Sequence, residues 1–357
     1  MNPAVLQRPL RVLVADDSAV ARGVIRACLE RDRGIEIVAE AGNGLQAVEL
    51  AQTLRPDLVT MDLDMPVLGG LEAIERIMAH RAVPILVITS ADDAAIAGEA
   101  IQRGALEVVR KPRCSEEQAR DLVARIRLLA GVPVITRRFR IDAEAPAPRP
   151  APVPQQPFPA PAGEGAEGRI VAIAASTGGP QALARILPRL PSAFRAPVVV
   201  AQHISEGFAE GLVGWLAGLC ALPVVLACDG QRLEAGHVYV SPPERNLVVT
   251  AARRLALVEP AATDVHHPSC DVLLRSVAEV FGAAAIGVIL SGMGRDGARG
   301  LGALRAAGGV TIAQDEASSV VFGMNRVAIE QEAVEHVLPV DRIGDEILAL
   351  LAARRRR

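Results

Sequence analysis

The sequence predicts an α/β protein with two doubly wound parallel sheets. Short apolar, strand-like runs alternate with helix-like runs of about 10–15 residues, and the alternation occurs twice along the 357 residues. Between the two halves, residues 146–161 hold eight of the 25 prolines, a composition typical of an extended linker. We therefore expect a first domain at 9–128, a Pro/Ala-rich linker at 129–167, a second domain at 168–350 and a basic tail at 351–357.

The strand-like and helix-like runs can be placed along the chain. In the first half, we expect strands at 10–15, 35–40, 58–61, 85–89 and 108–109, and helices at 19–31, 44–54, 70–80 and 115–129. In the second half, short apolar runs suit parallel strands that helices bury on both faces, at 170–174, 197–201, 223–227 and 286–290. We interpret the remaining strand-like runs as a small antiparallel β hairpin insertion, at 237–240, 246–249 and 255–258.

Composition excludes several classes of protein. Half the residues are apolar, 22% are charged and the net charge is −3, so neither a disordered chain nor a basic nucleic-acid binder is expected. The longest apolar runs fall short of the ~20 residues of a membrane span, and no signal-like leader is evident. The cysteines are odd in number and widely spaced, without a CxxC pair. This pattern argues against both a disulfide framework and a zinc site, and it fits a reducing cytoplasm.

Acidic residues follow two strands expected in the first half. Asp16 and Asp17 come after the first strand, and Asp62 and Asp64 after the third. In an open parallel sheet these strand ends share one edge, where carboxylates repel one another unless a cation lies among them. Their hard oxygen atoms favour Mg²⁺, although isolated Asp pairs are also common as helix N-caps and turn residues.

Two further residues point to phosphoryl chemistry at this edge. Thr89 ends the fourth strand, and Lys111 follows the fifth. Lys111 is the single lysine in a chain that otherwise uses arginine, so a task specific to an ammonium group is expected of it. A carboxylate beside Mg²⁺ can attack phosphorus, while a lysine and a threonine bind the phosphoryl oxygens.

The first half resembles the receiver domain of two-component response regulators in four stretches: VLVADDS (12–18), MDLDMPVLGG (61–70), ITS (88–90) and RKP (110–112). The resemblance implies a flavodoxin-like fold in which Asp62 is phosphorylated and Thr89 and Lys111 sense the phosphate. It implies Mg²⁺ held by the side chains of Asp17 and Asp62 and the backbone carbonyl of Asp64, with Asp16 in support. The family usually has an aromatic switch residue where this chain has Val108.

The second half contains a polar loop at a strand-to-helix junction. The expected strand ends at Ala175, and Ser176, Thr177, two glycines and a proline precede a helical run. A serine there can lie near the positive end of the helix, whose amides stabilise an oxyanion. Taken alone, the loop also suits a phosphate cradle or a plain helix cap.

Two other strand ends favour a nucleophile. His203 follows one apolar strand, and Asp296 follows another after a glycine-rich loop. If the strands are parallel, these residues emerge with Ser176 at one edge, in the geometry of a Ser–His–Asp triad. His203 would take the Ser176 proton and Asp296 would orient the imidazole. Glycines around Met293 would let a backbone amide approach the oxyanion.

The second half is also similar to the catalytic domain of chemotaxis-type (CheB) protein-glutamate methylesterases. The matching stretches are ASTGGPQAL (175–183), AQHISEGF (201–208), SPPERNL (241–247), HPSCDVLL (267–274), GVILSGMGRDGARGL (287–301) and IAQDEASSVVFGMNRVAI (312–329). The resemblance implies a Rossmann-like hydrolase fold. It assigns Ser176 as nucleophile, His203 as general base, Asp296 as its orienter and the Met293 main-chain N–H as oxyanion donor. Cys270 stands where Val or Ile is common, and we interpret it as a small packing residue.

The combined resemblance implies a phosphorylation-activated serine hydrolase. It would demethylate glutamate methyl esters on chemoreceptor cytoplasmic helices, release methanol and deamidate receptor glutamines. Its partner would be a sensor histidine kinase of the CheA type, and hydrolysis would need no cofactor. Two alternatives remain open from the residues: a Rossmann-like transferase whose STGGP loop binds a nucleotide phosphate, and a non-enzymatic regulator that exposes a binding surface when phosphorylated.

Overall fold

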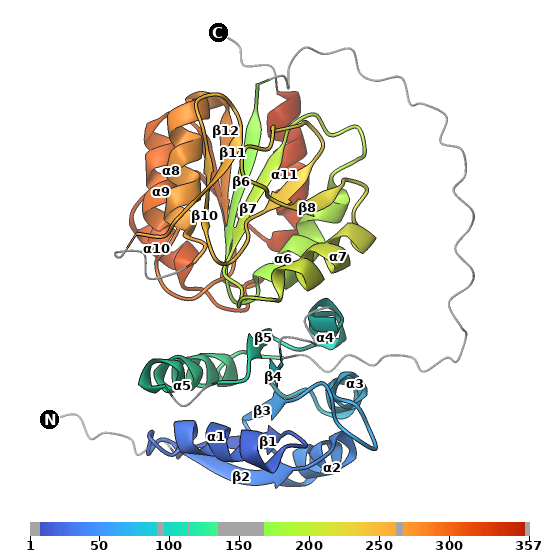
Figure 1. Ribbon diagram of the computed structural model, residues 1–357. Helices are drawn as coiled ribbons and strands as arrows, with labels where there is room; N and C mark the ends of the chain where they lie inside the picture. The colour runs from blue at the N-terminus through green and yellow to red at the C-terminus, as the bar shows by residue number, and fades with distance from the viewer. Residues whose placement is uncertain (1–7, 91–95, 113–114, 135–167, 262–266, 354–357) are drawn as a thin grey trace, which may run out of the picture.

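The protein contains two α/β domains, each built on a parallel sheet (Figure 1). The computed structural model describes residues 8–90, 96–112, 115–134, 168–261 and 267–353. Within them, one sheet has five strands and the other has seven, and all neighbouring strands of both run parallel. This confirms the predicted fold class. The proline-rich segment 146–161 and the last four arginines lie outside the described residues.

The first domain has the strand order β2-β1-β3-β4-β5. Every residue of β3 and β4 is buried, as expected for apolar strands with helices on both faces. One face packs against α1 and α5, and the other against α2, α3 and α4. The elements are β1 (Leu10–Ala15), α1 (Ala19–Leu29), β2 (Ile35–Ala41), α2 (Gly44–Leu54), β3 (Leu58–Met61), α3 (Gly70–His80), β4 (Ile85–Thr89), α4 (Ala97–Arg103), β5 (Glu107–Arg110) and α5 (Glu116–Ala130).

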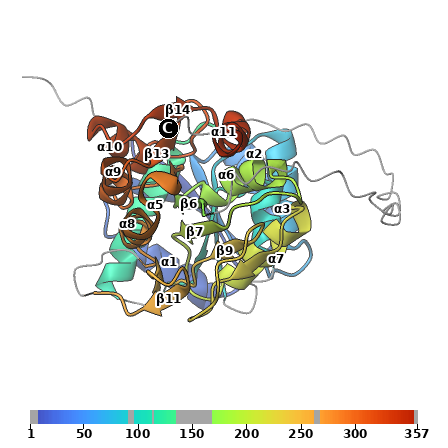
Figure 2. The ribbon, with the colours of Figure 1, turned by 90° about the horizontal axis from the view of Figure 1, so that it is seen from above.

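The second domain has the strand order β14-β13-β12-β6-β7-β9-β8, with β10 and β11 as a separate antiparallel pair. Seen from above, α6, α7 and α11 lie on one side of the sheet and α8, α9 and α10 on the other (Figure 2). The strands are β6 (Ile170–Ala175), β7 (Val198–Gln202), β8 (Val224–Leu226), β9 (Val238–Val240), β10 (Asn246–Val249), β11 (Leu255–Val258), β12 (Ala285–Ile289), β13 (Val310–Gln314) and β14 (His336–Leu338). The α-helices are α6 (Gly179–Ile186), α7 (Ala209–Leu219), α8 (Cys270–Phe281), α9 (Ala298–Ala306), α10 (Met324–Glu330) and α11 (Val340–Ala352).

The expected hairpin is partly confirmed. β10 and β11 form the antiparallel pair predicted at 246–249 and 255–258. The assignment of 237–240 to the same excursion is wrong, because β9 lies between β7 and β8 and pairs parallel with both. All three β9 residues are buried, which is typical of a strand inside a parallel sheet rather than of a hairpin at its margin. Two further strands, β13 and the edge strand β14, extend the sheet beyond the strands expected from sequence.

The strand order places the predicted catalytic residues. β6 lies between β12 and β7, so the chain crosses from one side of β6 to the other. In open parallel sheets, ligands bind at the carboxyl ends of strands near such a point. Ser176 follows β6, His203 follows β7, and Asp296 lies in the loop between β12 and α9.

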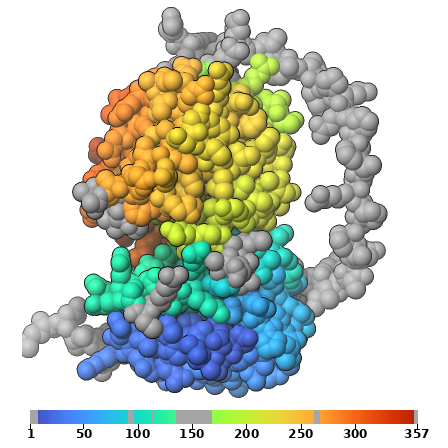
Figure 3. Space-filling view, in the orientation of Figure 1, coloured from blue at the N-terminus to red at the C-terminus, as the bar shows by residue number. Residues whose placement is uncertain are grey.

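The two domains are in direct contact (Figure 3). Helix α4 of the first domain packs against α6 and α7 of the second. Gly98 in α4 lies against Trp215 in α7 so closely that a Cβ atom at Gly98 would stand 2.7 Å from Trp215 Cγ. The amide nitrogen Nε2 of Gln181 in α6 donates hydrogen bonds to the carbonyl oxygens of Ala105 and Leu106, at 3.0 and 3.1 Å. None of the described helices is both long and apolar enough to cross a bilayer.

Candidate functional site

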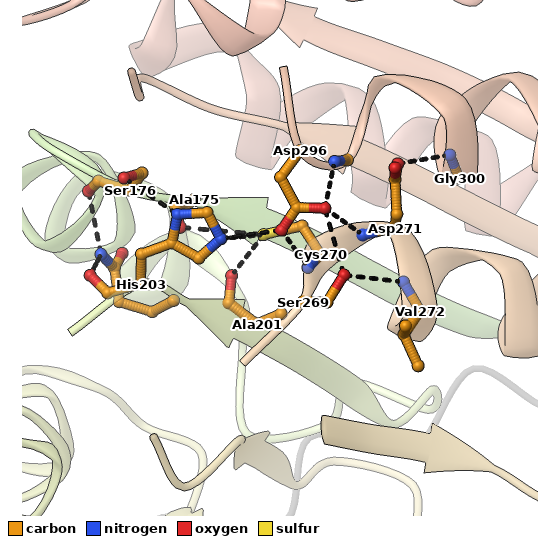
Figure 4. A network of polar contacts seen from close by, with 12 residues as sticks. Ala175, Ser176, Ala201, His203, Ser269, Cys270, Asp271, Val272, Asp296 and Gly300 are labelled. Carbon is orange, nitrogen blue, oxygen red and sulfur yellow. Dashed lines mark hydrogen bonds and ion pairs between the residues drawn. The ribbon is translucent and has the colours of Figure 1, made fainter. Parts of the chain in front are cut away.

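Ser176, His203 and Asp296 meet at the carboxyl edge of the second sheet (Figure 4). His203 Nδ1 lies 3.2 Å from Ser176 Oγ, and His203 Nε2 lies 2.9 Å from Asp296 Oδ2. Ser176 and Asp296 are buried, and His203 is partly buried. The convergence expected from the strand ends is therefore observed. A neutral imidazole with its proton on Nε2 donates to Asp296 and turns the Nδ1 lone pair toward Ser176.

The loop between β6 and α6 is held from the neighbouring strand. Gln202, the last residue of β7, donates from Nε2 to the carbonyl oxygens of Ser176 and His203, both at 2.9 Å. The backbone amide of His203 donates to the carbonyl of Ala175 at 2.9 Å. These bonds fix the backbones of Ser176 and His203 relative to each other, and this positions the two side chains for contact.

The N-terminus of α8 binds the Asp296 carboxylate. The backbone amides of Cys270 and Asp271 donate to its two oxygens at 2.7 and 2.9 Å. Ser269, whose hydroxyl caps α8, also donates to Oδ1 at 3.2 Å, and the amide of Gly297 donates at 3.0 Å. Helix N-termini carry a partial positive charge that favours an anion. The carboxylate is thus fully hydrogen-bonded on the side away from His203.

These contacts decide the charge of Asp296. Burial raises the pKa of a carboxyl group, but the hydrogen bonds from His203 and from the amides of Asp271 and Cys270 outweigh it and lower the pKa of Asp296 to about 2. The group is therefore an anion at neutral pH. A buried anion next to Nε2 stabilises the imidazolium that forms when His203 accepts a proton.

The loop after β12 approaches the serine closely. A Cβ atom on Gly292 would stand 2.7 Å from Ser176 Cβ, so only glycine allows this approach. Met293, the predicted oxyanion donor, is the next residue along the chain, and the residue is 41% exposed. The Ser176 backbone amide donates to the carbonyl of Ser291 at 3.1 Å. The Met293 backbone is thus carried on a segment that is hydrogen-bonded to the serine loop.

Cys270 has a contact that sequence reasoning did not anticipate. Its thiol is fully buried, and Sγ lies 3.5 Å from His203 Nε2. Burial, with Asp296 nearby, raises the pKa of this thiol well above its usual range, so it is a neutral group and not a nucleophile. His267, which precedes α8, lines the cavity between the domains.

The acidic cluster of the first domain also forms. Asp16, Asp17 and Asp62 each place a carboxylate oxygen within 4.8 Å of the others. Lys111 Nζ lies 2.9 Å from Asp16 Oδ2 and 2.7 Å from Asp62 Oδ2. Asp64 is exposed, and its side chain is not part of this group. Three convergent carboxylates are the oxygen donors that Mg²⁺ prefers.

Asp62 is buried at the end of β3, with 2% of its surface exposed. Burial raises the pKa of its carboxyl, and the Lys111 ammonium and a hydrogen bond with Thr89 partly offset the effect. Conversely, burial lowers the pKa of Lys111, but its bonds to Asp62 and Asp16 outweigh this and raise it. The single lysine is therefore a cation that spans two buried acids. Val108, in place of the usual aromatic residue, lines the cavity between the domains.

A cavity of about 510 Å³ lies between the domains and reaches Ser176 and His203. Ser176, Thr177 and His203 line it from one domain, and Glu107 and Arg125 from the other. Glu107 was not anticipated from sequence: its Oε2 accepts a 2.9 Å hydrogen bond from the Thr177 hydroxyl, and its other oxygen pairs with Arg125. Two residues from separate domains give no local sequence signal, so only the docked structure could reveal this contact.

The fold and the two sites define a class of protein, a hydrolase domain with a parallel sheet between helices that is attached to a receiver domain. The CheB methylesterase family matches residues 171–347, and the response regulator receiver domain family matches residues 12–127. A protein-glutamate methylesterase/protein-glutamine glutaminase of Paramagnetospirillum magneticum is 51% identical over 346 residues, covering 96% of this chain and 97% of its own length. The chain belongs to the CheB methylesterase family and carries a receiver domain.

Two other comparisons agree. A protein-glutamate methylesterase/protein-glutamine glutaminase of Myxococcus xanthus is 43% identical over 351 residues, covering 96% of this chain and 94% of its own length. The crystal structure of the CheB methylesterase catalytic domain of Thermotoga maritima is 37% identical, with a TM-score of 0.50, and covers 51% of this chain and 98% of that chain. The similarity therefore extends over both domains in the curated relatives and over the fold of the second domain in the solved structure.

Proposed function

We propose that the protein hydrolyses glutamate methyl esters on chemoreceptor cytoplasmic helices, with Ser176 as nucleophile. The observation that carries this proposal is the continuous chain of contacts from Ser176 Oγ through His203 to Asp296. A serine hydroxyl in contact with a histidine suits acyl transfer better than phosphate binding, the other role that the glycine-rich loop alone suggested.

We propose domain boundaries of 9–128 and 168–350, with 129–167 as the linker and 351–357 as the tail.

The hydrolytic cycle has two halves. Ser176 Oγ attacks the ester carbonyl while His203 Nδ1 takes its proton, and the Met293 backbone N–H donates to the oxyanion. His203 then returns the proton to the departing methoxide, which leaves as methanol, and an acyl-serine remains. In the second half, His203 takes a proton from a water molecule as the water oxygen attacks the acyl group, and His203 then returns this proton to Ser176 Oγ as glutamate is released. The same steps on a glutamine side chain release ammonia, so we also propose deamidation.

We propose that the receiver controls this reaction. Asp62 is the phosphorylated residue, and a sensor histidine kinase of the CheA type is the phosphoryl source. Mg²⁺, which would be held by Asp17, Asp62 and the carbonyl of Asp64 with Asp16 in support, supplies charge neutralisation at the acidic edge. Lys111 and Thr89 bind the phosphoryl oxygens. We propose a cytoplasmic location, where receptor signalling helices are accessible to the protein.

In the unphosphorylated state, we propose, the receiver restricts access to Ser176. This proposal is supported by the docking of α4 on α6 and α7, and by the bond from Thr177 to Glu107 beside the nucleophile. Phosphorylation of Asp62 draws Lys111 to the phosphate, loosens the adjacent strand β5 and releases the second domain. The proline-rich linker gives the domains room to separate.

Methanol release from isolated methylated receptors tests both proposals. Full-length protein should release methanol faster with Mg²⁺ and a small phosphodonor, and Asp62→Asn should abolish the acceleration while keeping the basal rate. Ser176→Ala should release none under either condition. Wild-type rates in Ser176→Ala would refute the nucleophile, and equal rates with and without demonstrated Asp62 phosphorylation would refute the switch.

A further inference from the structure

Three side chains with metal-binding atoms converge in the hydrolase centre. Cys270 Sγ lies 3.5 Å from His203 Nε2, which lies 2.9 Å from Asp296 Oδ2. All three atoms lie within 4.8 Å of one another. Zn²⁺ binds sulfur at about 2.3 Å and imidazole nitrogen at about 2.0 Å, so its tetrahedral ligands S and N stand about 3.5 Å apart. The observed sulfur–nitrogen separation already has this value.

We propose that Cys270, His203 and Asp296 form an inhibitory site for a thiophilic divalent ion such as Zn²⁺. The set combines a sulfur, an imidazole nitrogen and a carboxylate oxygen, a combination that suits borderline-soft ions and not Mg²⁺. It is therefore chemically distinct from the all-carboxylate cluster of the receiver. Of the three donors, His203 lines the cavity between the domains, so an ion that enters this cavity would meet His203 first.

Binding of the ion would stop the hydrolase by changing the protonation of His203, an inference that rests on the proposed role of His203 as base. The metal takes the lone pair of Nε2, so the imidazole proton must reside on Nδ1. Nδ1–H then donates to Ser176 Oγ, 3.2 Å away, and has no lone pair to accept the serine proton. The nucleophile is left unactivated although every side chain remains in place.

Protons and charges balance when the ion binds. Before binding, the thiol and Nε2 each carry a proton; afterwards only Nδ1 does, so one proton leaves to solvent. The thiolate and the Asp296 carboxylate together offset the two positive charges of the ion. The buried centre changes from a net charge of −1 to zero, so the complex carries no excess charge.

Direct binding can be measured with Co²⁺ as a spectroscopic substitute. Full-length protein, with Mg²⁺ in excess to occupy the receiver, should show a thiolate-to-cobalt charge-transfer band at one ion per chain. Ser176→Ala keeps all three donors and should show the same band, so this readout is independent of hydrolysis. Cys270→Val and Cys270→Ser should lose the band. A band of equal intensity in both Cys270 variants would overturn the proposal.

Inhibition provides the second arm. Zn²⁺ should slow methanol release by the wild-type protein, and a zinc-selective chelator should restore it. The rate of each protein with zinc is compared with its own rate in chelator. Cys270→Val should need about tenfold or more zinc than wild type for the same fractional loss of activity. The reason is that removal of one ligand weakens metal binding at least as much as removal of a group that supports a ligand. Equal sensitivity of wild type and Cys270→Val would overturn the site, whereas failure of Ser176→Ala to lose activity would overturn only the proposed function.

Discussion

The hydroxyl of Thr177 donates a 2.9 Å hydrogen bond to the carboxylate of Glu107, across the boundary between the two domains. Thr177 follows the proposed nucleophile directly, and Glu107 begins β5, the strand that leads to Lys111. On the same strand, Arg110 lies 3.9 Å from Glu206 in the loop after His203. One strand of the receiver therefore contacts two of the three loops that carry the proposed catalytic residues, and it ends beside the acidic cluster.

Removal of the Glu107 carboxylate should weaken docking. A net hydrogen-bond contribution of about 1 kcal/mol corresponds to about a fivefold shift in the equilibrium between docked and separated domains. We expect Glu107→Ala to raise methanol release by the unphosphorylated protein several-fold and to leave the fully phosphorylated rate unchanged. Glu107→Gln retains an acceptor for the Thr177 hydroxyl, so its basal rate of methanol release should lie between those of wild type and Glu107→Ala. A basal rate equal to that of wild type in both variants would contradict this role.

The contact between Gly98 and Trp215 offers an independent test of docking. Because a Cβ atom at Gly98 would overlap Trp215, Gly98→Val should separate the domains, raise basal activity and change the emission of Trp215, the single tryptophan. Gly23 in α1 is the matched control, since nothing lies within 4 Å of a Cβ there, and Gly23→Val should leave emission and rate as in wild type. Unchanged emission in Gly98→Val would show that the interface tolerates the added side chain.

Asp296→Asn tests the orientation of His203. An amide cannot stabilise the imidazolium and can favour the wrong tautomer, and the corresponding change in serine hydrolases lowers kcat about 10⁴-fold. We expect kcat to fall by a similar factor, roughly 10³–10⁴-fold. KM should change little, because Asp296 lies behind the imidazole. A loss expressed mainly in KM would indicate a role in substrate binding instead.

The same variant should reveal a pH-dependent contribution to stability. The pKa of Asp296 is lowered from 3.8 to about 2 in the folded protein. The ionised carboxylate therefore stabilises the fold at every pH above 3.8, the pKa in the unfolded chain. This stabilisation is lost as the pH falls from 3.8 toward 2. The full contribution is about 2 kcal/mol. Urea unfolding of the second domain should show wild type more stable than Asp296→Asn by this order at neutral pH. The difference should shrink from about pH 5 to about pH 3, and a difference that stays constant would contradict the assignment.

The sequence could predict those site residues that directly follow strands. Ser176, His203 and Asp296 each follow an apolar run, and parallel strands bring their carboxyl ends to one edge, so convergence required only the fold class. The bounds of β1, α2, β3, α3 and β4 likewise match the expected ranges, because period and capping are local properties.

Contacts that depend on tertiary placement were not predictable. The amides of α8 that bind Asp296, and the thiol of Cys270 beside His203, come from a helix whose position the sequence pattern does not encode. The parallel pairing of β9 was missed because a three-residue strand carries no periodicity with which to tell sheet from hairpin. The Glu107 contact with Thr177 joins two domains, and no local pattern in either specifies how they dock.

The central claim is that His203 and Asp296 activate Ser176 as a nucleophile, and covalent labelling with a fluorophosphonate tests it most directly. Peptide mapping of the labelled full-length protein should place the adduct on Ser176, with labelling faster after treatment with Mg²⁺ and a phosphodonor and nearly absent in His203→Ala. An adduct on another residue, or labelling of Ser176 at the wild-type rate in His203→Ala, would contradict the account.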